Sequence, residues 1–227
     1  KGHPEWAALM GEAGIQVVSL ANNHIMDQGA TGLFSTFEAL KEVAVRFVGA
    51  GKGMDEAWGP LFVDVRGAKI AILARSSVVV NGAFYASNER PGGAWLDHDE
   101  TLRQVAELKE VCEVVILLIH WGVEHYHYPT PRQRMEAAEF IDAGANLVIG
   151  HHPHVLQGVE RIRKGLVAYS LGNFLFDDFK WSFIDKEGQP QERHIRFSEE
   201  NRRGGILNIA LSERGVDSCE FIPTRIG

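Results

Sequence analysis

The chain has 227 residues, of which 45% are hydrophobic, and this is enough to bury the core of one large domain. Its 23 Lys and Arg against 30 Asp and Glu give a formal net charge of −7, and the sequence has no basic stripe, so nucleic acid is not expected as a partner. Only two cysteines, Cys112 and Cys219, occur, which excludes a disulfide framework; we interpret both as core thiols, with a single bridge as the alternative.

The amino-terminal half alternates helix-like and strand-like segments, which is typical of a layered α/β domain. Residues 3–14 predict a helix, and residues 15–20 predict a buried strand that stops at a polar loop. A second helix and a short strand are expected over residues 31–43 and 46–51. Residues 61–77 hold two alternating runs around a turn and predict an antiparallel hairpin, so we expect a mixed sheet.

The second half continues the alternation. Residues 88–97 are rich in Gly, Pro and Asn and predict a surface loop, whereas the charged residues 177–203 lack periodicity and predict a mobile loop. The remaining predicted elements are a helix at 99–111, a strand at 113–120, a helix at 131–144, strands at 145–150 and 165–176, and a hairpin at 205–226. No internal repeat or linker divides the chain, so a single domain is expected.

Three of the predicted strands end in polar clusters. These clusters are "SLANNHIMD" (19–27), "LIHWGVEHYHY" (118–128) and "VIGHHPHV" (148–155), and together they hold seven of the ten histidines. In open α/β sheets, sites form beyond the carboxyl ends of strands, because the loops there converge while the strands hold them rigid. Imidazole and carboxamide groups are ligands for Zn, Mn or Fe, so the pattern predicts a metal site.

The "HHPH" run favours convergence of two of its histidines. His152 and His154 lie two residues apart, so in an extended segment their side chains project to the same side, while His151 points elsewhere. Pro153 biases His152 toward such an extended conformation. A lone histidine at a strand end is usually an ordinary hydrogen-bonded residue, and "NNHIMD" alone also fits a turn. Three convergent clusters favour the functional interpretation.

Four motifs in order resemble the poly-γ-glutamate capsule-synthesis protein family (CapA-like), itself similar to the calcineurin-like metallophosphoesterases. They are "SLANNHIMDQGATGL", "IHWGVEHYHYPTPRQR", "IGHHPHVLQGVE" and "YSLGNFLFD", and the similarity runs from about residue 12 to residue 176. The resemblance implies an α/β fold of the metallo-dependent phosphatase kind, a four-layer α/β/β/α sandwich with mixed sheets and a metal site at the strand ends.

The resemblance also implies roles for single residues. The implied ligands of one or two divalent metal ions (Zn, Mn or Fe) are Asn23, His120, His152 and His154. His24 is implied to be catalytic, donating a proton to the leaving group, and an imidazole suits this task because its ordinary pKa lies near neutrality. Asp27 and Glu124 are implied to be polar residues that support the ligands from behind.

One feature of the superfamily pattern is missing. That pattern opens with a strand ending in Gly-Asp, which supplies ligands of the first metal, and no Gly-Asp pair occurs in this chain. We therefore expect one CapA-like domain over residues 1–227 that lacks its N-terminal first strand and first metal motif. The alternative is a protein that has lost the complete two-metal centre.

The resemblance implies a capsule biosynthesis protein that is a metal-dependent hydrolase of a phosphoester or γ-glutamyl bond. Two alternatives stay open: a non-catalytic polymer-binding or assembly component of the capsule machinery, and a nucleotidase-like phosphatase. The expected substrate is poly-γ-glutamate or another anionic small or polymeric molecule, and other capsule-synthesis components are expected partners.

Two arginines are candidates for binding that anion. Arg75 and Arg90 could pair with carboxylates through both guanidinium nitrogens, and ordinary surface ion pairing is the alternative for each. The resemblance implies a membrane-associated or extracytoplasmic bacterial protein, although the chain shows neither a signal peptide nor a run of about eighteen apolar residues.

Overall fold

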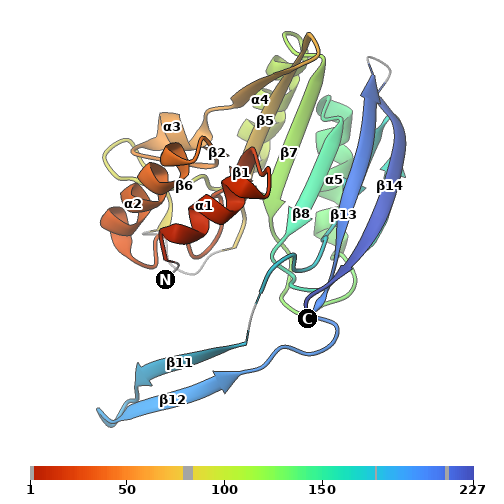
Figure 1. Cartoon of the computed structure of the whole chain (residues 1–227). Helices are drawn as coiled ribbons and strands as arrows, with labels where there is room; N and C mark the ends of the chain where they lie inside the picture. The colour runs from red at the N-terminus through yellow and green to blue at the C-terminus, as the bar shows by residue number, and fades with distance from the viewer. Residues whose placement is uncertain (1–2, 79–83, 177, 213–214) are drawn as a thin grey trace.

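A six-stranded mixed sheet lies at the centre of the computed structural model, which describes residues 3–78, 84–176, 178–212 and 215–227 (Figure 1). In spatial order its strands are β4 (Leu61–Val65), β5 (Ala68–Ser76), β7 (Val114–His120), β8 (Leu147–His151), β10 (Gly165–Ala168) and β9 (Val159–Ile162). The four central strands are parallel, and β4 and β9 pair antiparallel at the two edges. The hairpin predicted for residues 61–77 is confirmed, and so is the mixed sheet.

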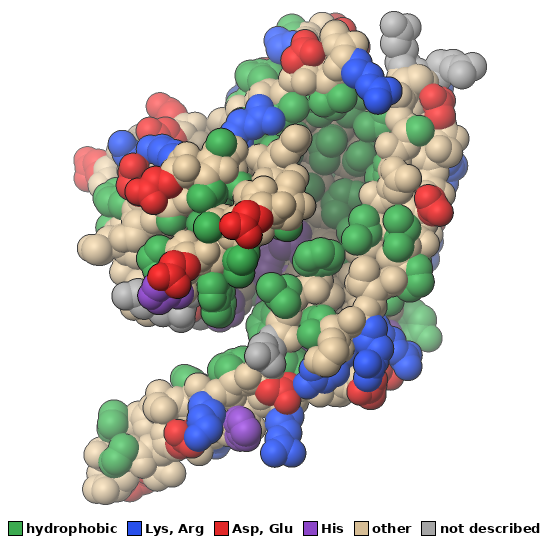
Figure 2. All heavy atoms as spheres, viewed as in Figure 1, with side chains coloured by type: hydrophobic (Ala, Val, Ile, Leu, Met, Phe, Trp, Pro, Cys, Tyr) green, Lys and Arg blue, Asp and Glu red, His purple; other side chains and the backbone are tan. Residues whose placement is uncertain are grey.

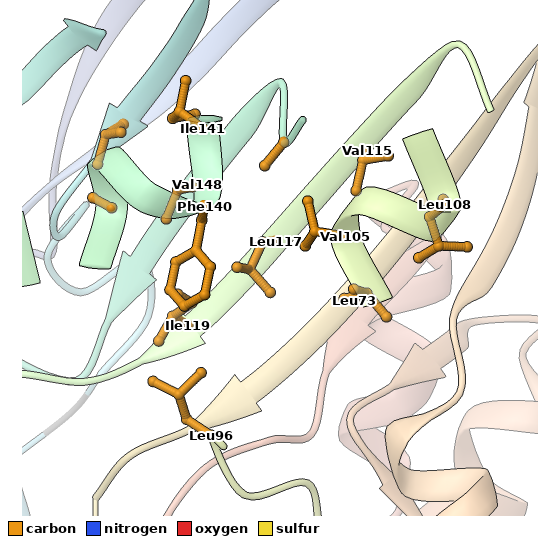
Figure 3. Packing of buried hydrophobic residues seen from close by; sticks show 14 of the residues in the cluster. Leu73, Leu96, Val105, Leu108, Val115, Leu117, Ile119, Phe140, Ile141 and Val148 are labelled. Atoms are coloured by element: carbon orange, nitrogen blue, oxygen red, sulfur yellow. The ribbon is translucent and has the colours of Figure 1, made fainter. Parts of the chain in front are cut away.

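Two helices cover one face of this sheet. Helix α4 (His98–Lys109) begins at Asp97, whose side chain accepts from the Glu100 backbone N–H. Helix α5 (Pro131–Ala143) begins with a capping box between Thr130 and Gln133. Figure 3 shows how Val105 from α4 and Phe140 from α5 pack with sheet residues such as Leu117. Burying each such side chain stabilises the fold by roughly 1.5–3 kcal/mol.

Two separate strand pairs cover the other face. Strand β1 (Val17–Ser19) pairs parallel with β2 (Arg46–Val48), and β13 (Arg203–Ser212) pairs antiparallel with β14 (Gly215–Arg225). Helix α2 (Gly29–Glu42) packs on the outer side of β1 and β2, and α1 (Glu5–Glu12) lies against α2. The four-layer α/β/β/α arrangement is therefore confirmed, as is the hairpin predicted for 205–226.

The two strand pairs leave a hollow between them. Figure 1 shows the pairs standing apart on the same face of the sheet, and Figure 2 shows hydrophobic side chains inside the opening. Ile116, Leu118 and Ile149 project to this face from the central strands β7 and β8, and each is only half-buried. Within the described residues β1 pairs only with β2, and β13 pairs with β14 and, at its first residues alone, with Gly172, so each strand pair keeps an edge that is free over most of its length.

The prediction of a surface loop over residues 88–97 is wrong for the middle of that segment, which forms a short buried strand. Gly92–Gly93 forms strand β6, which pairs with β3 (Ala50–Gly51) beside the short helix α3 (Met54–Trp58), and both glycines are buried. A Cβ on Gly92 would lie 2.7 Å from backbone atoms of the preceding segment, so glycine is needed here for close packing rather than for a turn.

The mobile loop predicted for residues 177–203 is also wrong. Strands β11 (Phe179–Ile184) and β12 (Pro190–Ile195) form an antiparallel hairpin that extends away from the body (Figure 1). Phe179, Trp181 and Phe183 alternate with other residues, and this is the period-two signal of a strand. The many charged residues around these aromatic residues made the alternation hard to detect in the sequence.

Both cysteines are free: Cys112 is buried in the core just after α4, and Cys219 is a half-buried residue of β14. The interpretation as core thiols is confirmed. Among the helices of the described residues, none combines the length and the apolar character needed to cross a bilayer.

Candidate metal centre

The three polar clusters meet at one edge of the central sheet, as predicted from their positions at the carboxyl ends of the strands. The register places His120, the last residue of β7, directly beside His151, the last residue of β8. Asn23 and His24 reach the same place from the loop after β1, and histidine side chains are visible deep in the hollow in Figure 2. The residues that the sequence predicted as ligands are thus brought together.

Asn23 and His120 form the buried part of the cluster. Each is 7% exposed, and the Asn23 Oδ1 atom lies 2.9 Å from His120 Nε2. The His120 ring lies 4.6 Å from the ring of His152 and 4.9 Å from that of His151, measured between centroids. His151 therefore lies next to the predicted ligands. The alternation of side chains along a strand had predicted that it would point away from them.

His152 and His154 converge by another route than the one predicted. Their φ angles are 105° and 58°, so neither is extended, and the backbone turns sharply on both sides of Pro153. Such left-handed conformations cost about 1–3 kcal/mol for residues with a side chain, and they concentrate at functional sites. The two imidazoles nevertheless share one location with Glu124, since the ligand atoms of the three residues lie within 4.8 Å of one another.

The His24 side chain is exposed and held by a carboxylate. Its Nδ1 atom lies 2.9 Å from Asp27 Oδ2, and its Nε2 atom lies 3.3 Å from Asn23 Nδ2. Asp27 therefore supports His24 rather than a predicted ligand. The pair orients the imidazole with Nε2 toward the buried cluster, which is the arrangement needed for proton transfer to a ligand bound there.

Burial and mutual repulsion favour the neutral form of three histidines in the cluster, His120, His151 and His152. Burial lowers the pKa of His120 far below its ordinary value, and neighbouring histidines, His151 first, lower it further. The pKa of His151 and of His152 is lowered to about 4 in each case, mainly by burial, although Glu124 opposes the shift at His152. A neutral imidazole is the form that binds a metal ion.

These shifts predict a pH-dependent stability of the metal-free protein. Unfolded histidines have a pKa of about 6.5, so between that value and about 4 the unfolded state binds more protons at His151 and His152 than the folded state. The free energy of unfolding should therefore fall as the pH is lowered from 6.5 toward 4, by up to about 1.4 kcal/mol per pH unit for each group. Urea unfolding in the presence of a chelator at pH 7, 6 and 5 measures this slope. His152→Gln should make it shallower, and a flat profile in the wild type would contradict the assignment.

The two arginines predicted to bind substrate differ in placement. Arg75 is fully buried: its guanidinium donates to the backbone carbonyls of Ala74 and Trp58 and to Gln104, and it stacks on the Trp58 ring. Burial lowers the pKa of Arg75 to about 10. The guanidinium of Arg75 is not accessible to an anion in solution, so the prediction that Arg75 binds substrate is wrong. Arg90 is exposed and donates to the carbonyl of Tyr85.

Two asparagines reach the centre without having been predicted. Asn173 Oδ1 lies 2.8 Å from His154 Nδ1, and Asn201 Nδ2 lies 2.9 Å from both His125 Nδ1 and the His154 carbonyl oxygen. Asn173 could have been found, because it follows β10, the parallel neighbour of β8. Asn201 lies within residues 177–203, for which the sequence predicts a loop, and no sequence pattern there indicates a site residue.

The assembled residues fit a divalent ion. The Nδ1 atoms of His120 and His152 are buried and have no hydrogen-bond partner among the described residues, which is costly unless another group satisfies them. Imidazole nitrogens, an amide oxygen and the Glu124 carboxylate are together suited to Zn, Mn or Fe.

Comparison with known proteins gives a consistent family. Residues 1–178 match the family described as bacterial capsule synthesis protein PGA_cap. The chain is 39% identical over 170 residues to the capsule biosynthesis protein CapA of Bacillus anthracis, an alignment of 73% of this chain and 41% of that protein. It is 34% identical over 174 residues to the PGA biosynthesis protein CapA of Bacillus subtilis, covering 76% and 46%. The chain thus spans less than half the length of these two relatives.

Two solved structures share the fold. The NAD nucleotidase of Haemophilus influenzae aligns with a TM-score of 0.58 and 19% identity over 98% of this chain and 42% of that one. The sulfate thiohydrolase SoxB of Thermus thermophilus aligns with a TM-score of 0.59 and 14% identity over 96% and 34%. At these identities the likeness establishes the fold alone.

Proposed function

The chain belongs to the bacterial capsule synthesis protein family PGA_cap, and from this membership we propose that it takes part in the biosynthesis of a poly-γ-glutamate capsule. Within that process we propose a metal-dependent hydrolysis of a phosphoester or γ-glutamyl bond. One observation carries the hydrolytic part: imidazole nitrogens, an amide oxygen and a carboxylate converge beside an exposed histidine that is itself held by a carboxylate.

The proposed division of work among the residues follows their placement. The residues that would hold a Zn, Mn or Fe ion are the four predicted ligands Asn23, His120, His152 and His154, joined by Glu124, which was predicted to support the ligands from behind. When bound by these residues, a divalent ion would supply polarisation of substrate oxygens and a lowered pKa of water. His24, oriented by Asp27, would protonate the leaving group from the solvent side of the cluster. Binding of the anionic polymer by Arg90 stays a prediction.

The experiment is hydrolysis by the protein reconstituted with Zn, Mn or Fe, using a small phosphomonoester, a phosphodiester and a γ-glutamyl amide. We expect turnover of one class, and we expect His24→Gln to lower kcat by roughly 10²–10⁴-fold, because general acid catalysis contributes about that much. The metal content of His24→Gln should be unchanged. His194→Gln, an exposed histidine on β12, is the matched control and should keep full activity.

Three results would redirect the proposal. Equal activity in His24→Gln and wild type would remove His24 from the chemistry. Metal binding without turnover of any of the three substrates, combined with retention of poly-γ-glutamate in a binding assay, would favour the non-catalytic component of the capsule machinery. Turnover of nucleotides and other small phosphoesters alone would favour the nucleotidase-like alternative.

We also propose that a further strand completes the second β-layer. The free edges of β1 and β13 flank the hollow, and the half-buried Ile116, Leu118 and Ile149 form its apolar floor. Free strand edges and exposed apolar surface are normally covered. The proposed strand would carry the expected Gly-Asp motif to the cluster, and a structure that includes polypeptide beyond residues 1–227 would test this.

A further inference from the structure

Two asparagine side chains join the root of the β11–β12 hairpin to the histidine cluster. Asn201 follows that hairpin and is buried, at 7% exposure, although it lies outside the residues that match the family. Asn173, also 7% exposed, donates through Nδ2 to the Asn201 carbonyl oxygen at 2.9 Å. The two amides thus form one connected group, in contact with His125 and His154.

The orientation of the Asn201 amide is determined by backbone partners. Its Oδ1 atom accepts from the backbone N–H and the hydroxyl of Ser198, and its Nδ2 atom donates to the carbonyl oxygen of His154. A backbone N–H can only donate and a carbonyl can only accept, so the amide cannot be flipped. The second Nδ2 hydrogen therefore points to His125 Nδ1 at 2.9 Å. His125 Nδ1 must accept, and in the neutral ring the proton lies on Nε2.

The same reasoning gives His154 the opposite tautomer. Because Asn173 Nδ2 donates to the Asn201 carbonyl, its Oδ1 atom faces His154 Nδ1 at 2.8 Å. An amide oxygen only accepts, so His154 Nδ1 carries the proton and Nε2 presents a lone pair. Two neighbouring rings, with centroids 6.2 Å apart, thus offer a lone pair on His154 and an N–H on His125.

We propose that Asn201 and Asn173 assign different tasks to these two histidines: His154 binds the metal ion through Nε2, and His125 donates its Nε2–H to an oxyanion of the ligand bound beside that ion. His125 suits this task because its ring is exposed while its backbone is fixed by a 2.7 Å hydrogen bond to the Pro153 carbonyl. The ligand class is an anionic oxygen, either phosphoryl or carboxylate. Anion binding by His125 rests on the metal centre proposed above, whereas the tautomers of His125 and His154 follow from the hydrogen bonds alone.

The first test is the tautomeric state, measured by nitrogen NMR on the metal-free protein with ¹⁵N-labelled histidine. We expect His125 to be protonated on Nε2 and His154 on Nδ1. Asn201→Asp replaces the donor by an acceptor and should move the His125 proton to Nδ1, whereas Asn208→Asp, an exposed asparagine on β13, should leave both rings unchanged. Wild-type His125 protonated on Nδ1 would overturn the inference, whether or not the protein is an enzyme.

The second test is anion affinity, measured by titrating inorganic phosphate and a γ-glutamyl dipeptide into the protein with and without bound metal. His125→Phe should weaken binding of the matching anion at least tenfold, as expected for losing one hydrogen bond to a charged group, while metal content stays at the wild-type level. The dipeptide and phosphate arms separate a carboxylate ligand from a phosphoryl ligand. Unchanged affinity for both anions in His125→Phe would remove His125 from the site.

Discussion

Replacing His152 and His154 together by alanine is expected to abolish stoichiometric metal binding. The two residues supply two of the three ligand atoms that lie within 4.8 Å of one another, and the remaining one belongs to the exposed Glu124 carboxylate. Of the five proposed ligands, Asn23, His120 and this carboxylate would remain, and a set without the two convergent imidazoles should no longer retain an ion through purification. Elemental analysis of protein purified without added metal, repeated after reconstitution, should therefore give about one ion per wild-type chain and background levels in the double variant.

The control must remove two histidines without touching the cluster. His3 and His194 are exposed and lie on opposite parts of the chain, so His3→Ala/His194→Ala should keep the wild-type metal content. Asn173→Leu provides an intermediate case, since loss of the partner that orients a ligand typically weakens metal affinity by about 10–100-fold. Metal retained by His152→Ala/His154→Ala, or absent from reconstituted wild type, would contradict the proposed centre.

The location of this centre could be predicted from the sequence because it follows from strand order. Continuous apolar runs predicted buried parallel strands, and the carboxyl ends of such strands meet at one edge, so His120 and the "HHPH" run had to lie close together. The fold class followed from the same alternation and from the family resemblance. These signals are local in sequence and repeated along the chain.

The detailed geometry could not be predicted, because it depends on tertiary contacts. The left-handed backbone at His152 and His154 contradicts their expected extended conformation, and at His154 it is accompanied by hydrogen bonds from Asn201 and Asn173 in distant segments. Arg75 looked like a surface cation because the sequence does not show that Trp58 and α4 close over β5. Long-range packing decided each of these cases.

Trp121→Ala is expected to cause the largest loss of stability among single substitutions near the centre. Trp121 is fully buried, and its Nε1–H donates to the Tyr169 carbonyl at 3.1 Å. The indole lies directly over Gly150, where an added Cβ would fall 2.3 Å from Nε1. Truncating such a side chain typically costs about 3–5 kcal/mol, and the orphaned carbonyl adds to that cost.

The measurement is the urea midpoint of Trp121→Ala against that of Trp181→Ala, an exposed tryptophan on β11 whose loss should change the free energy of unfolding by less than about 0.5 kcal/mol. The backbone N–H of Trp121 also donates to the His151 carbonyl, so this residue joins the ends of β7 and β8. A loosened junction there should weaken metal binding in the part of the population that stays folded. Equal midpoints for the two variants would mean that the strand ends, and the histidines they carry, are held in place by something other than the Trp121–Gly150 contact.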